Sequence, residues 1–290
     1  MAVPGRTGEI SSVTDFIDKI KTLTPISDGF YTFRGEANAN WPMGPGIMRV
    51  GNENLLANER NAIRDLVSVH PNEFLPDQSM FDRLVRMQHF GLPTRLMDVT
   101  ANPLVALFNA TEEHIDTSGN PTDGKVLYIA IPNDRRKYYD SDTISCLSNL
   151  ANMSPDEKAE ILRNYKKEVE FFNDPERVPS ADRLLQFIRA EKPSFRPIIR
   201  AYELNMTWYV VPKLSNRRII AQNGAFLIFG LTKNLWRPTK YIALVFRWLS
   251  VPHSIKGTIR SDLATLGITE SALFPEIDKA AKLVARRYAP

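Results

Sequence analysis

The order of the apolar patterns along the chain is the feature that most limits its fold. Before residue 190, segments with helix-spaced apolar residues alternate with short runs of strand-forming residues. From about residue 194 the runs become strand-like and follow one another closely. This order favours an α+β protein, with a mixed or antiparallel sheet core and surrounding helices, over regular βαβ alternation. No glycine-rich phosphate loop follows a strand, so a Rossmann or P-loop site is not supported.

Caps, breakers and periodicity place the individual elements. The expected helices cover residues 11–23, 52–70, 79–90, 102–114, 154–190 (interrupted at two prolines), 254–267 and 275–287. The expected strands cover residues 30–35, 125–131, 195–202, 207–212, 217–222, 224–230 and 240–249. Asn223 and Gly224 predict a hairpin turn between two of these strands. Asn102 is a good helix cap, and Pro103 suits a first turn, where no N–H is missed.

Length and composition predict one large globular unit. The chain has 290 residues, 43% of them hydrophobic, which is enough for a sizeable core. We expect a single domain over residues 1–290, with a helical and strand part at about 1–130, a helical insertion at about 135–192 and a strand-rich part at about 194–290. The single cysteine, Cys146, excludes an internal disulfide and a multi-cysteine zinc site. No signal-peptide pattern and no membrane-length apolar run is present, so we expect a soluble, cytoplasmic protein.

Residues 81–110 concentrate hydrogen-bonding side chains between two expected helices. These side chains are Gln88, His89, Thr94, Arg95, Asp98 and Thr100. Loops held between rigid elements often carry binding chemistry, so we expect this segment to form the wall of a site. Structural roles compete: His89 suits the carbonyls of a helix C-terminus, Arg95 could pair with Asp98, and the threonines could serve as turn or cap residues. Asp98 has no partner at metal-ligand spacing, so we expect no metal.

Two other segments carry candidate site residues. Arg34 lies at the end of the strand expected at 30–35, and its guanidinium could bind phosphate or take part in an ordinary surface ion pair. Gly35 beside it could permit the close approach of backbone or ligand. Gln222 could project its amide toward a ligand hydroxyl or simply precede the hairpin turn.

The chain resembles the FRG-domain family. The resemblance spans nearly the whole chain, and the family signature corresponds to Phe33, Arg34 and Gly35. It rests on FYTFRGE, WPMGPGIMR, QHFGLPTRLMDVTANPLVALFNA, RRIIAQNGAF and LGITESALFPEID. Because the biochemistry of the family is not settled, this resemblance leaves function open.

The order of elements is also similar to the ADP-ribosyltransferase fold. That resemblance implies Arg34 on a first strand, Thr100 on a second strand before a helix, and Gln222 in a third motif, with these three as catalytic residues. It implies that NAD+ is bound by Arg34, Gly35, Gln88, His89, Thr94, Arg95 and Asp98.

In such a site the nicotinamide–ribose bond of NAD+ breaks while positive charge develops on the sugar. A carboxylate usually stabilises that charge. This chain departs from the pattern because Gln222 stands where a glutamate is expected. A glutamine supplies no negative charge, a loss of roughly 2–4 kcal/mol, so Asp98 or Glu36 would have to supply it. Otherwise the protein binds NAD+ or ADP-ribose without turnover.

We therefore expect an enzyme that uses NAD+ to modify an intracellular macromolecule. The pI of about 9.1 and the tryptophans favour RNA or DNA over protein as the acceptor. The resemblance fits a toxin or phage-defence effector, for which an antitoxin partner would be expected. The alternatives are a non-catalytic module that binds a nucleotide or nucleic acid, and a hydrolase using His89 with Asp98, for which no nucleophile stands in a recognisable turn.

Overall fold

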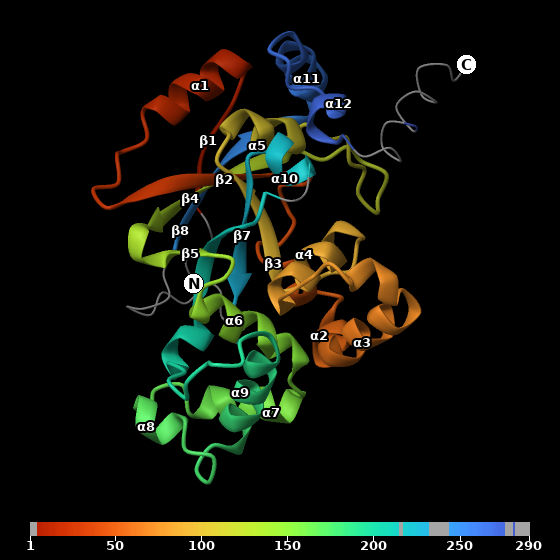
Figure 1. Cartoon of the computed structure of the whole chain (residues 1–290). Helices are drawn as coiled ribbons and strands as arrows, with labels where there is room; N and C mark the ends of the chain where they lie inside the picture. The colour runs from red at the N-terminus through yellow and green to blue at the C-terminus, as the bar shows by residue number, and fades with distance from the viewer. Residues whose placement is uncertain (1–4, 215–216, 232–243, 276–280, 282–290) are drawn as a thin grey trace.

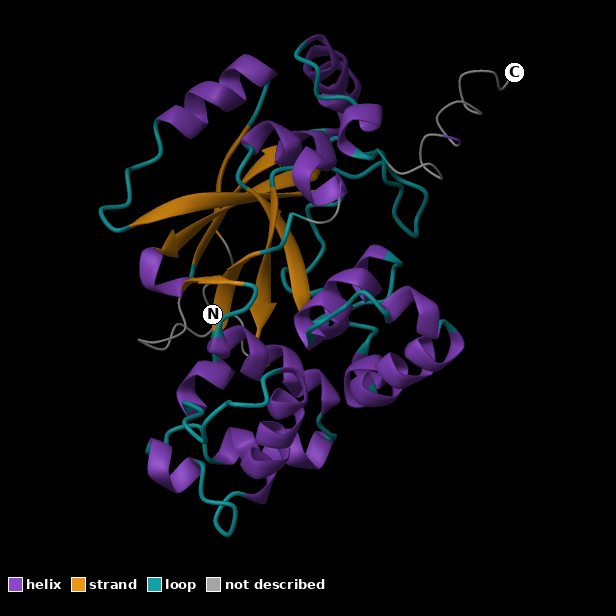
Figure 2. Ribbon diagram, in the orientation of Figure 1, coloured by secondary structure: helices purple, strands orange, loops and turns teal. Residues whose placement is uncertain are grey.

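The fold is built on one twisted sheet of eight strands, with helices on its faces and at its lower end (Figures 1 and 2). The computed structural model describes residues 5–214, 217–231, 244–275 and 281. The strands are β1 (Gly5–Glu9), β2 (Gly29–Glu36), β3 (Leu96–Thr100), β4 (Gly124–Pro132), β5 (Arg136–Tyr138), β6 (Thr207–Val211), β7 (Gly224–Phe229) and β8 (Val245–Val251). Their spatial order is β1-β8-β4-β2-β3-β7-β6-β5.

The helices fall between and after these strands. They are α1 (Val13–Lys21), α2 (Glu53–Ala57), α3 (Glu59–Val69), α4 (Met80–His89), α5 (Pro103–Ala110), α6 (Asp142–Asn149), α7 (Pro155–Arg163), α8 (Val169–Phe172), α9 (Pro179–Glu191), α10 (Arg217–Ala221), α11 (Lys256–Thr265) and α12 (Glu270–Leu273). Short 3-10 helices occupy Gly46–Met48, Pro71–Phe74, Asn133–Arg135, Leu150–Asn152, Ala201–Asn205 and His253–Ile255.

The strand pairing confirms the α+β prediction. The edge pairs β1–β8 and β5–β6 are parallel, and the five pairs between them are antiparallel. The helices do not alternate regularly with the strands along the chain. Antiparallel pairing through the centre of the sheet is what clustered strands produce when crossover helices are missing.

The sheet is nearly divided in two between β2 and β3. Within the described residues, one register pair, Phe33 with Thr100, joins these strands, whereas β2 and β4 pair along their full lengths. The side chain of Thr32 adds a second link by donating to the carbonyl of Thr100 at 3.0 Å. Beyond this point β2 and β3 separate, and the backbone groups facing the gap need other partners.

Three apolar clusters fill the interior. One lies between α1, α5, α11 and the half of the sheet formed by β1, β8, β4 and β2. A second lies between the other half and helices α3, α4, α6, α7 and α9. The third joins the remaining faces of the two halves, with Leu127 and Ile129 from β4 meeting Met97 and Leu227 from β3 and β7. The two halves therefore share one core despite their weak strand pairing.

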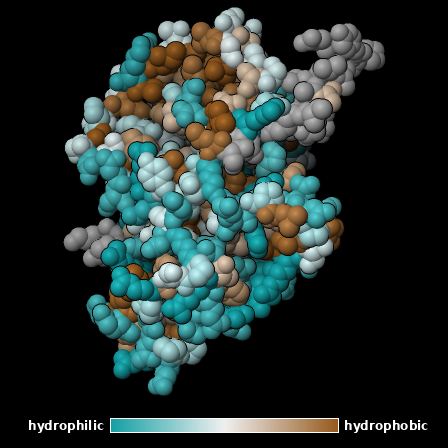
Figure 3. Space-filling view, in the orientation of Figure 1, coloured by the Kyte–Doolittle hydropathy of each residue, from teal (hydrophilic) through white to brown (hydrophobic). Residues whose placement is uncertain are grey.

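Helices α6 to α9 gather at one end of the sheet (Figure 1). On the face seen in Figure 3 this end is mostly hydrophilic, whereas apolar side chains collect near α1 and α5. The helices correspond to much of the insertion expected at 135–192, although residues 136–138 form β5. They share a core with α3, α4 and β7, so they pack directly on the rest of the chain. No helix of the described ranges combines the length and apolar character needed to cross a membrane.

Several expected elements are wrong, each for a local reason. Residues 217–221 form helix α10 and not a strand, because a short Ile219-Ile220 pair fits either pattern and Ile219 here packs into the helical core. Residues 195–202 form no strand; Pro197 supplies no N–H for a ladder. Asn58 divides the helix expected at 52–70, and the helix after Pro103 ends at Ala110.

Three of the described strands were not expected, and two predictions cannot be judged. Strands β1 and β3, together with the three-residue strand β5, were missed, β3 because its polar residues indicate a loop although it is a central strand. The helix expected at 275–287 lies almost wholly outside the described residues, as does the start of the strand expected at 240–249.

Candidate functional site

A cavity of about 340 Å³ opens where β2 and β3 separate. Its walls come from the end of β2, from β3, from the end of α5, and from α10, α11 and α12. The lining residues are Phe33, Arg34, Gly35, Glu36, Ala37, Trp41, Asp98, Val99, Thr100, Phe108, Asn109, Glu112, Arg218, Gln222, Arg260, Glu270 and Phe274. Both aromatic and charged groups face the same space, as is common in sites for small molecules.

The structure brings the three predicted catalytic positions to this cavity. Arg34, Thr100 and Gln222 all line it, although they lie far apart in the sequence. Thr100 donates from Oγ1 to the carbonyl of Gln222 at 2.6 Å and accepts from the N–H of Asn102 at 2.9 Å. These bonds tie β3 to the segment after α10. The Thr100 hydroxyl thus binds backbone groups, as the alternative role of a turn or cap residue requires.

Gln222 sits in the turn between α10 and β7 rather than on a strand. Its amide Nε2 donates to the carbonyl of Leu273, at the end of α12, at 3.1 Å. The predicted hairpin at Asn223 is wrong, since a helix precedes the turn, but Asn223 does adopt a positive φ of 46°. This left-handed conformation lets the chain reverse directly from α10 into β7.

Arg34 closes the gap between the two separating strands. Its Nη1 donates to the carbonyl of Asp98 on β3 at 2.8 Å, and its Nε donates to Glu36 at 3.0 Å. The side chain is 21% exposed and Nη2 bonds to no atom of the described residues. A cavity-lining guanidinium held through two of its three nitrogens is a preorganised donor for phosphate or carboxylate.

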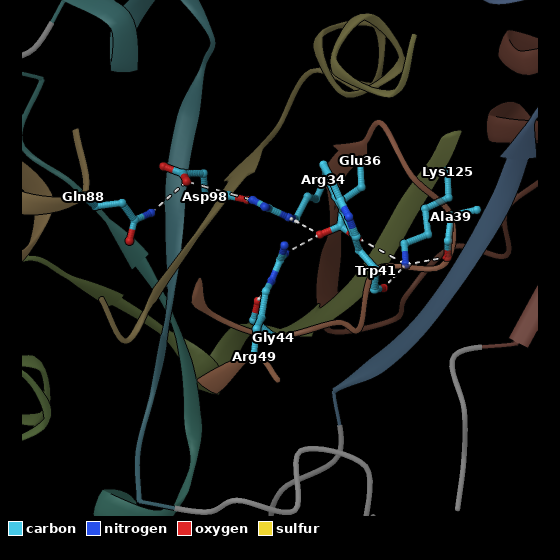
Figure 4. A network of polar contacts seen from close by, with 9 residues as sticks. All are labelled: Arg34, Glu36, Ala39, Trp41, Gly44, Arg49, Gln88, Asp98 and Lys125. Carbon is cyan, nitrogen blue, oxygen red and sulfur yellow. Dashed lines mark hydrogen bonds and ion pairs between the residues drawn. The ribbon is translucent and has the colours of Figure 1, made fainter. Parts of the chain in front are cut away.

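Glu36 is the centre of a buried charge cluster (Figure 4). Its side chain is 1% exposed and forms ion pairs with Arg34 at 3.0 Å, Arg49 at 2.7 Å and Lys125 at 3.2 Å. Burial raises the pKa of the Glu36 carboxyl, but these three cations together outweigh burial and hold that pKa below its ordinary value. Glu36 is therefore ionised, buried and paired with three cations, so it does not fit the expectation of a free catalytic carboxylate.

The same cluster carries more positive than negative charge. Lys125 donates to the carbonyls of Ala39 and Trp41, which fixes the loop after β2. Burial lowers the pKa of Lys125 and of Arg49, and Glu36 offsets this only in part because one carboxylate is shared among three cations. The surplus favours an anion in the neighbouring cavity, which Arg34 touches.

Three residues of the central motif form a connected chain of hydrogen bonds. Thr94 donates to Oε1 of Gln88 at 2.6 Å, and Nε2 of Gln88 donates to Oδ2 of Asp98 at 2.7 Å (Figure 4). The Asp98 side chain is 55% exposed and lies 3.9 Å from Nη1 of Arg34. Asp98 therefore lines the cavity, whereas Gln88 supports it from α4, and Thr94 is buried behind both.

His89 lies beside this site rather than in it. It ends α4 and lines two adjoining grooves, one of which also includes Gln88, Asp98 and Gln222. Its ring meets the ring of Phe90 edge-on, with centroids 5.3 Å apart. The position at a helix C-terminus fits the structural alternative for His89.

Gly35 serves close packing with a helix. A Cβ built on Gly35 would lie 1.8 Å from the carbonyl oxygen of Ala106 and 2.7 Å from the nitrogen of Ala110, both in α5. Gly124 on β4 meets the same helix, with its Cβ position 2.0 Å from the carbonyl oxygen of Ala110. Gly35 does line the cavity, but the close approach that it permits is that of α5.

Arg95 does not fit its predicted role in ligand binding. Its side chain is 1% exposed and forms a two-point ion pair with Glu59, which Lys158 also contacts. A further bond runs from Nη1 to the carbonyl of Phe229 at 3.1 Å. Arg95 therefore joins α3, β3 and α7 in the interior and lies outside the cavity. Arg95 also pairs with Glu59 and not with Asp98, the partner considered from the sequence.

Sequence reasoning missed several residues of the site. The basic and acidic side chains not anticipated in or beside the cavity are Arg49, Glu112, Lys125, Arg218, Arg260 and Glu270. Arg260 stacks on Phe108 at 4.0 Å from the ring centroid, and Arg218 lies 5.0 Å from the centroid of Phe274. Arg49, Arg218 and Glu270 lie in segments that carry the family resemblance, but nothing in those segments indicates that they meet at one cavity, so only the fold reveals their position. No cluster of three or more potential metal ligands occurs in the part of the chain described.

The comparisons with known proteins identify one domain. No curated protein and no solved structure matches the chain. The model of the FRG domain matches residues 30–118, which include β2, α4, β3 and α5. That stretch holds Arg34, Glu36, Arg49 and the Thr94–Gln88–Asp98 hydrogen-bond chain, whereas Gln222 and the walls from α10 to α12 lie outside it. The chain therefore contains an FRG domain.

Proposed function

We propose that this protein is an ADP-ribosyltransferase-like enzyme that binds NAD+ in the cavity between β2 and β3. One observation carries the proposal: Arg34, Thr100 and Gln222, from three remote segments, line a single cavity where the sheet divides. The two-part sheet with a cleft at its junction supports the ADP-ribosyltransferase-like core expected from the order of elements. The volume of about 340 Å³ lies at the lower end of the range for ligand sites.

The chemistry of the walls suits a dinucleotide. The open Nη2 of Arg34, beside a cluster with surplus positive charge, would hold the pyrophosphate. Trp41 and Phe274, which are partly exposed, supply aromatic surface against which a nicotinamide or adenine ring could lie. Aromatic and cationic groups in one cleft are the combination that a nucleotide requires.

The acceptor belongs to the same proposal. We propose an intracellular macromolecule, with RNA or DNA favoured by the pI of about 9.1. A compact transferase of this kind would fit a toxin or phage-defence effector restrained by an antitoxin protein. Growth arrest on expression, relieved by substitution of Arg34, is the result expected for a toxin.

Incubation of the purified chain with labelled NAD+ tests the proposal. Release of nicotinamide, or transfer of label to an RNA, DNA or protein pool, should fall at least 100-fold in Arg34→Ala, because that change removes the anchor for the pyrophosphate. Arg177→Ala is the matched control, since Arg177 is 58% exposed and its contacts are with the nearby Asp174 and Phe171, which do not line the cavity. Wild-type protein that neither cleaves NAD+ nor transfers label would refute the enzymatic proposal.

A second function is favoured by a specific observation. Gln222 carries no charge and its amide donates to the carbonyl of Leu273, so it lacks the carboxylate chemistry expected at this place. A non-catalytic module that binds a nucleotide through Arg34 is consistent with this arrangement. Saturable NAD+ or ADP-ribose binding by calorimetry, lost in Arg34→Ala and without nicotinamide release, would support the binding module over the enzyme.

A further inference from the structure

The proposed reaction needs a carboxylate in the cavity, and four line it: Glu36, Asp98, Glu112 and Glu270. Glu36 is buried among three cations, one of which, Lys125, is itself almost fully buried. A carboxylate already held by that many partners gains little by facing a developing positive charge, and it is not accessible to a sugar hydroxyl.

Glu112 and Glu270 have weaker claims than Asp98. Glu270 and Asp98 each lie 3.9 Å from an arginine, Arg260 and Arg34 respectively, so a nearby cation does not distinguish them. Asp98 is in addition held by a hydrogen bond from the Gln88 amide. Glu112 is exposed after the end of α5, and no hydrogen bond to its side chain within the described residues sets its direction. Catalysis by electrostatic stabilisation depends on groups that are oriented before the charge develops.

Asp98 is oriented in this way. The hydroxyl of Thr94 donates to Oε1 of Gln88 at 2.6 Å, which leaves the Nε2 end of that amide to face Asp98. Nε2 then donates to Oδ2 of Asp98 at 2.7 Å. Oδ1 bonds to no atom of the described residues, and the side chain is 55% exposed at the cavity wall. One oxygen is thus fixed from behind, and the other remains open to a ligand.

We propose that Asp98 is the catalytic carboxylate of this site, and that Gln88 and Thr94 are positioning residues that aim it. The inference rests on the proposed transferase function. It explains how a chain with Gln222 at the expected glutamate position supplies negative charge to the sugar. It also assigns an indirect role to Thr94, which is buried and does not line the cavity.

In the step concerned, the bond between the nicotinamide nitrogen and C1 of the ribose breaks. Its electron pair leaves with the nitrogen, which turns the pyridinium into neutral nicotinamide, and C1 becomes positively charged. Asp98 stabilises that charge by accepting a hydrogen bond from a ribose hydroxyl. The lone pair of an acceptor group, or of water, then forms the new bond to C1, and the proton of that group passes to solvent.

Asp98→Asn tests the catalytic assignment, because it removes the charge at nearly constant shape. Asp98→Asn should slow nicotinamide release roughly 10²–10³-fold while the Kd for NAD+ stays within about threefold. Asp262→Asn is the matched control, since Asp262 is exposed on α11. Glu112 and Glu270 line the same cavity, so Glu112→Gln and Glu270→Gln should each slow nicotinamide release, but by less than Asp98→Asn does.

A double-mutant cycle tests the positioning role separately from stability. Gln88→Leu and Thr94→Val should each lower kcat about tenfold with little change in KM, and Thr94→Ser should restore it. Because Thr94 acts through Gln88, the double variant should be no slower than Gln88→Leu alone. Thr94 also accepts a hydrogen bond from the N–H of Leu96 at 3.2 Å, so Thr94→Val should lower thermal stability as well as kcat. In contrast to the effects on kcat, the losses of thermal stability in Thr94→Val and Gln88→Leu should add in the double variant.

The possible outcomes separate the two claims. Wild-type turnover of NAD+ with Asp98→Asn within threefold of wild type would overturn the assignment and leave the transferase proposal standing. Additive kcat losses in the cycle would overturn the positioning role. Wild-type protein without NAD+ turnover would overturn the transferase proposal and, with it, the role of Asp98.

Discussion

Substitution of Gly35 by alanine should destabilise the whole domain. The new Cβ would lie 1.8 Å from the carbonyl oxygen of Ala106, whereas ordinary contact begins at 3.4 Å. Strand β2 or helix α5 must therefore move by about 1.6 Å to accept one methyl group. Neither element moves easily, because β2 pairs along its length with β4 and α5 also rests on Gly124.

The expected loss in the free energy of unfolding is large because the atoms that the new methyl group meets belong to a helix backbone. Overpacking a tight core typically costs about 1–3 kcal/mol, and a helix backbone yields less than a side chain does, so the upper value of about 3 kcal/mol applies. Replacing glycine by alanine restricts the unfolded chain and returns about 0.4–1 kcal/mol. The free energy of unfolding should therefore fall by about 2 kcal/mol or more.

Urea denaturation followed by circular dichroism measures this loss. With a slope of about 3 kcal/mol per molar urea, the midpoint should fall by about 0.7 M. Gly257→Ala is the control, because its Cβ position on α11 meets no atom within 4 Å, and alanine there should stabilise the helix by about 0.5–1 kcal/mol. A Gly35→Ala midpoint equal to that of wild type would refute the argument that α5 rests on this glycine.

Three further predictions concern buried groups. Glu36→Gln should lower stability at neutral pH by about 3 kcal/mol, since three cations lose their shared carboxylate. Because the pKa of Glu36 is held below its ordinary value of 4.5 in the folded protein, its contribution to the free energy of unfolding is present above pH 4.5 and is lost as pH falls through the folded pKa. If urea titrations show the same loss of stability in acid for Glu36→Gln as for wild type, this prediction is contradicted. Arg95→Met should lower stability by about 3–5 kcal/mol in thermal unfolding, as it leaves Glu59 buried with one partner; a change below 1 kcal/mol would disprove the buried pair. Burial raises the pKa of the Cys146 thiol far above its ordinary value, so a thiol reagent should label the protein only in denaturant, and fast labelling of the native state would be inconsistent with this packing.

Local patterns predicted the elements whose boundaries are set by their own residues. The Asn102 side chain accepts from the N–H of Leu104 with Pro103 in the first turn, as the cap prediction required. Strand β2 and the apolar β4 were likewise evident from alternation and composition. In these segments local preference and tertiary packing agree, so sequence alone was sufficient.

Tertiary contacts decided the rest. β3 carries Asp98, a residue of loop-like character, yet its neighbours Met97 and Val99 are buried between two antiparallel partners. Arg34 and Gln222, both singled out from the sequence, line one cavity, but their detailed partners were not predictable. Nothing local indicates that Arg49 and Lys125 converge on Glu36, because they come from a loop and from β4.

The junction between β2 and β3, where the two halves of the sheet meet, is closed mainly by side chains. The Phe-Arg-Gly signature can therefore be explained by folding as well as by activity. Arg34 and Thr32 supply bonds that a backbone ladder would normally provide, and Gly35 admits the helix that covers the join. An FRG motif would therefore be maintained by folding alone, even in a relative that had lost every chemical activity. The motif therefore identifies a fold. Evidence of catalysis must come from groups that the fold does not need, such as the Oδ1 oxygen of Asp98.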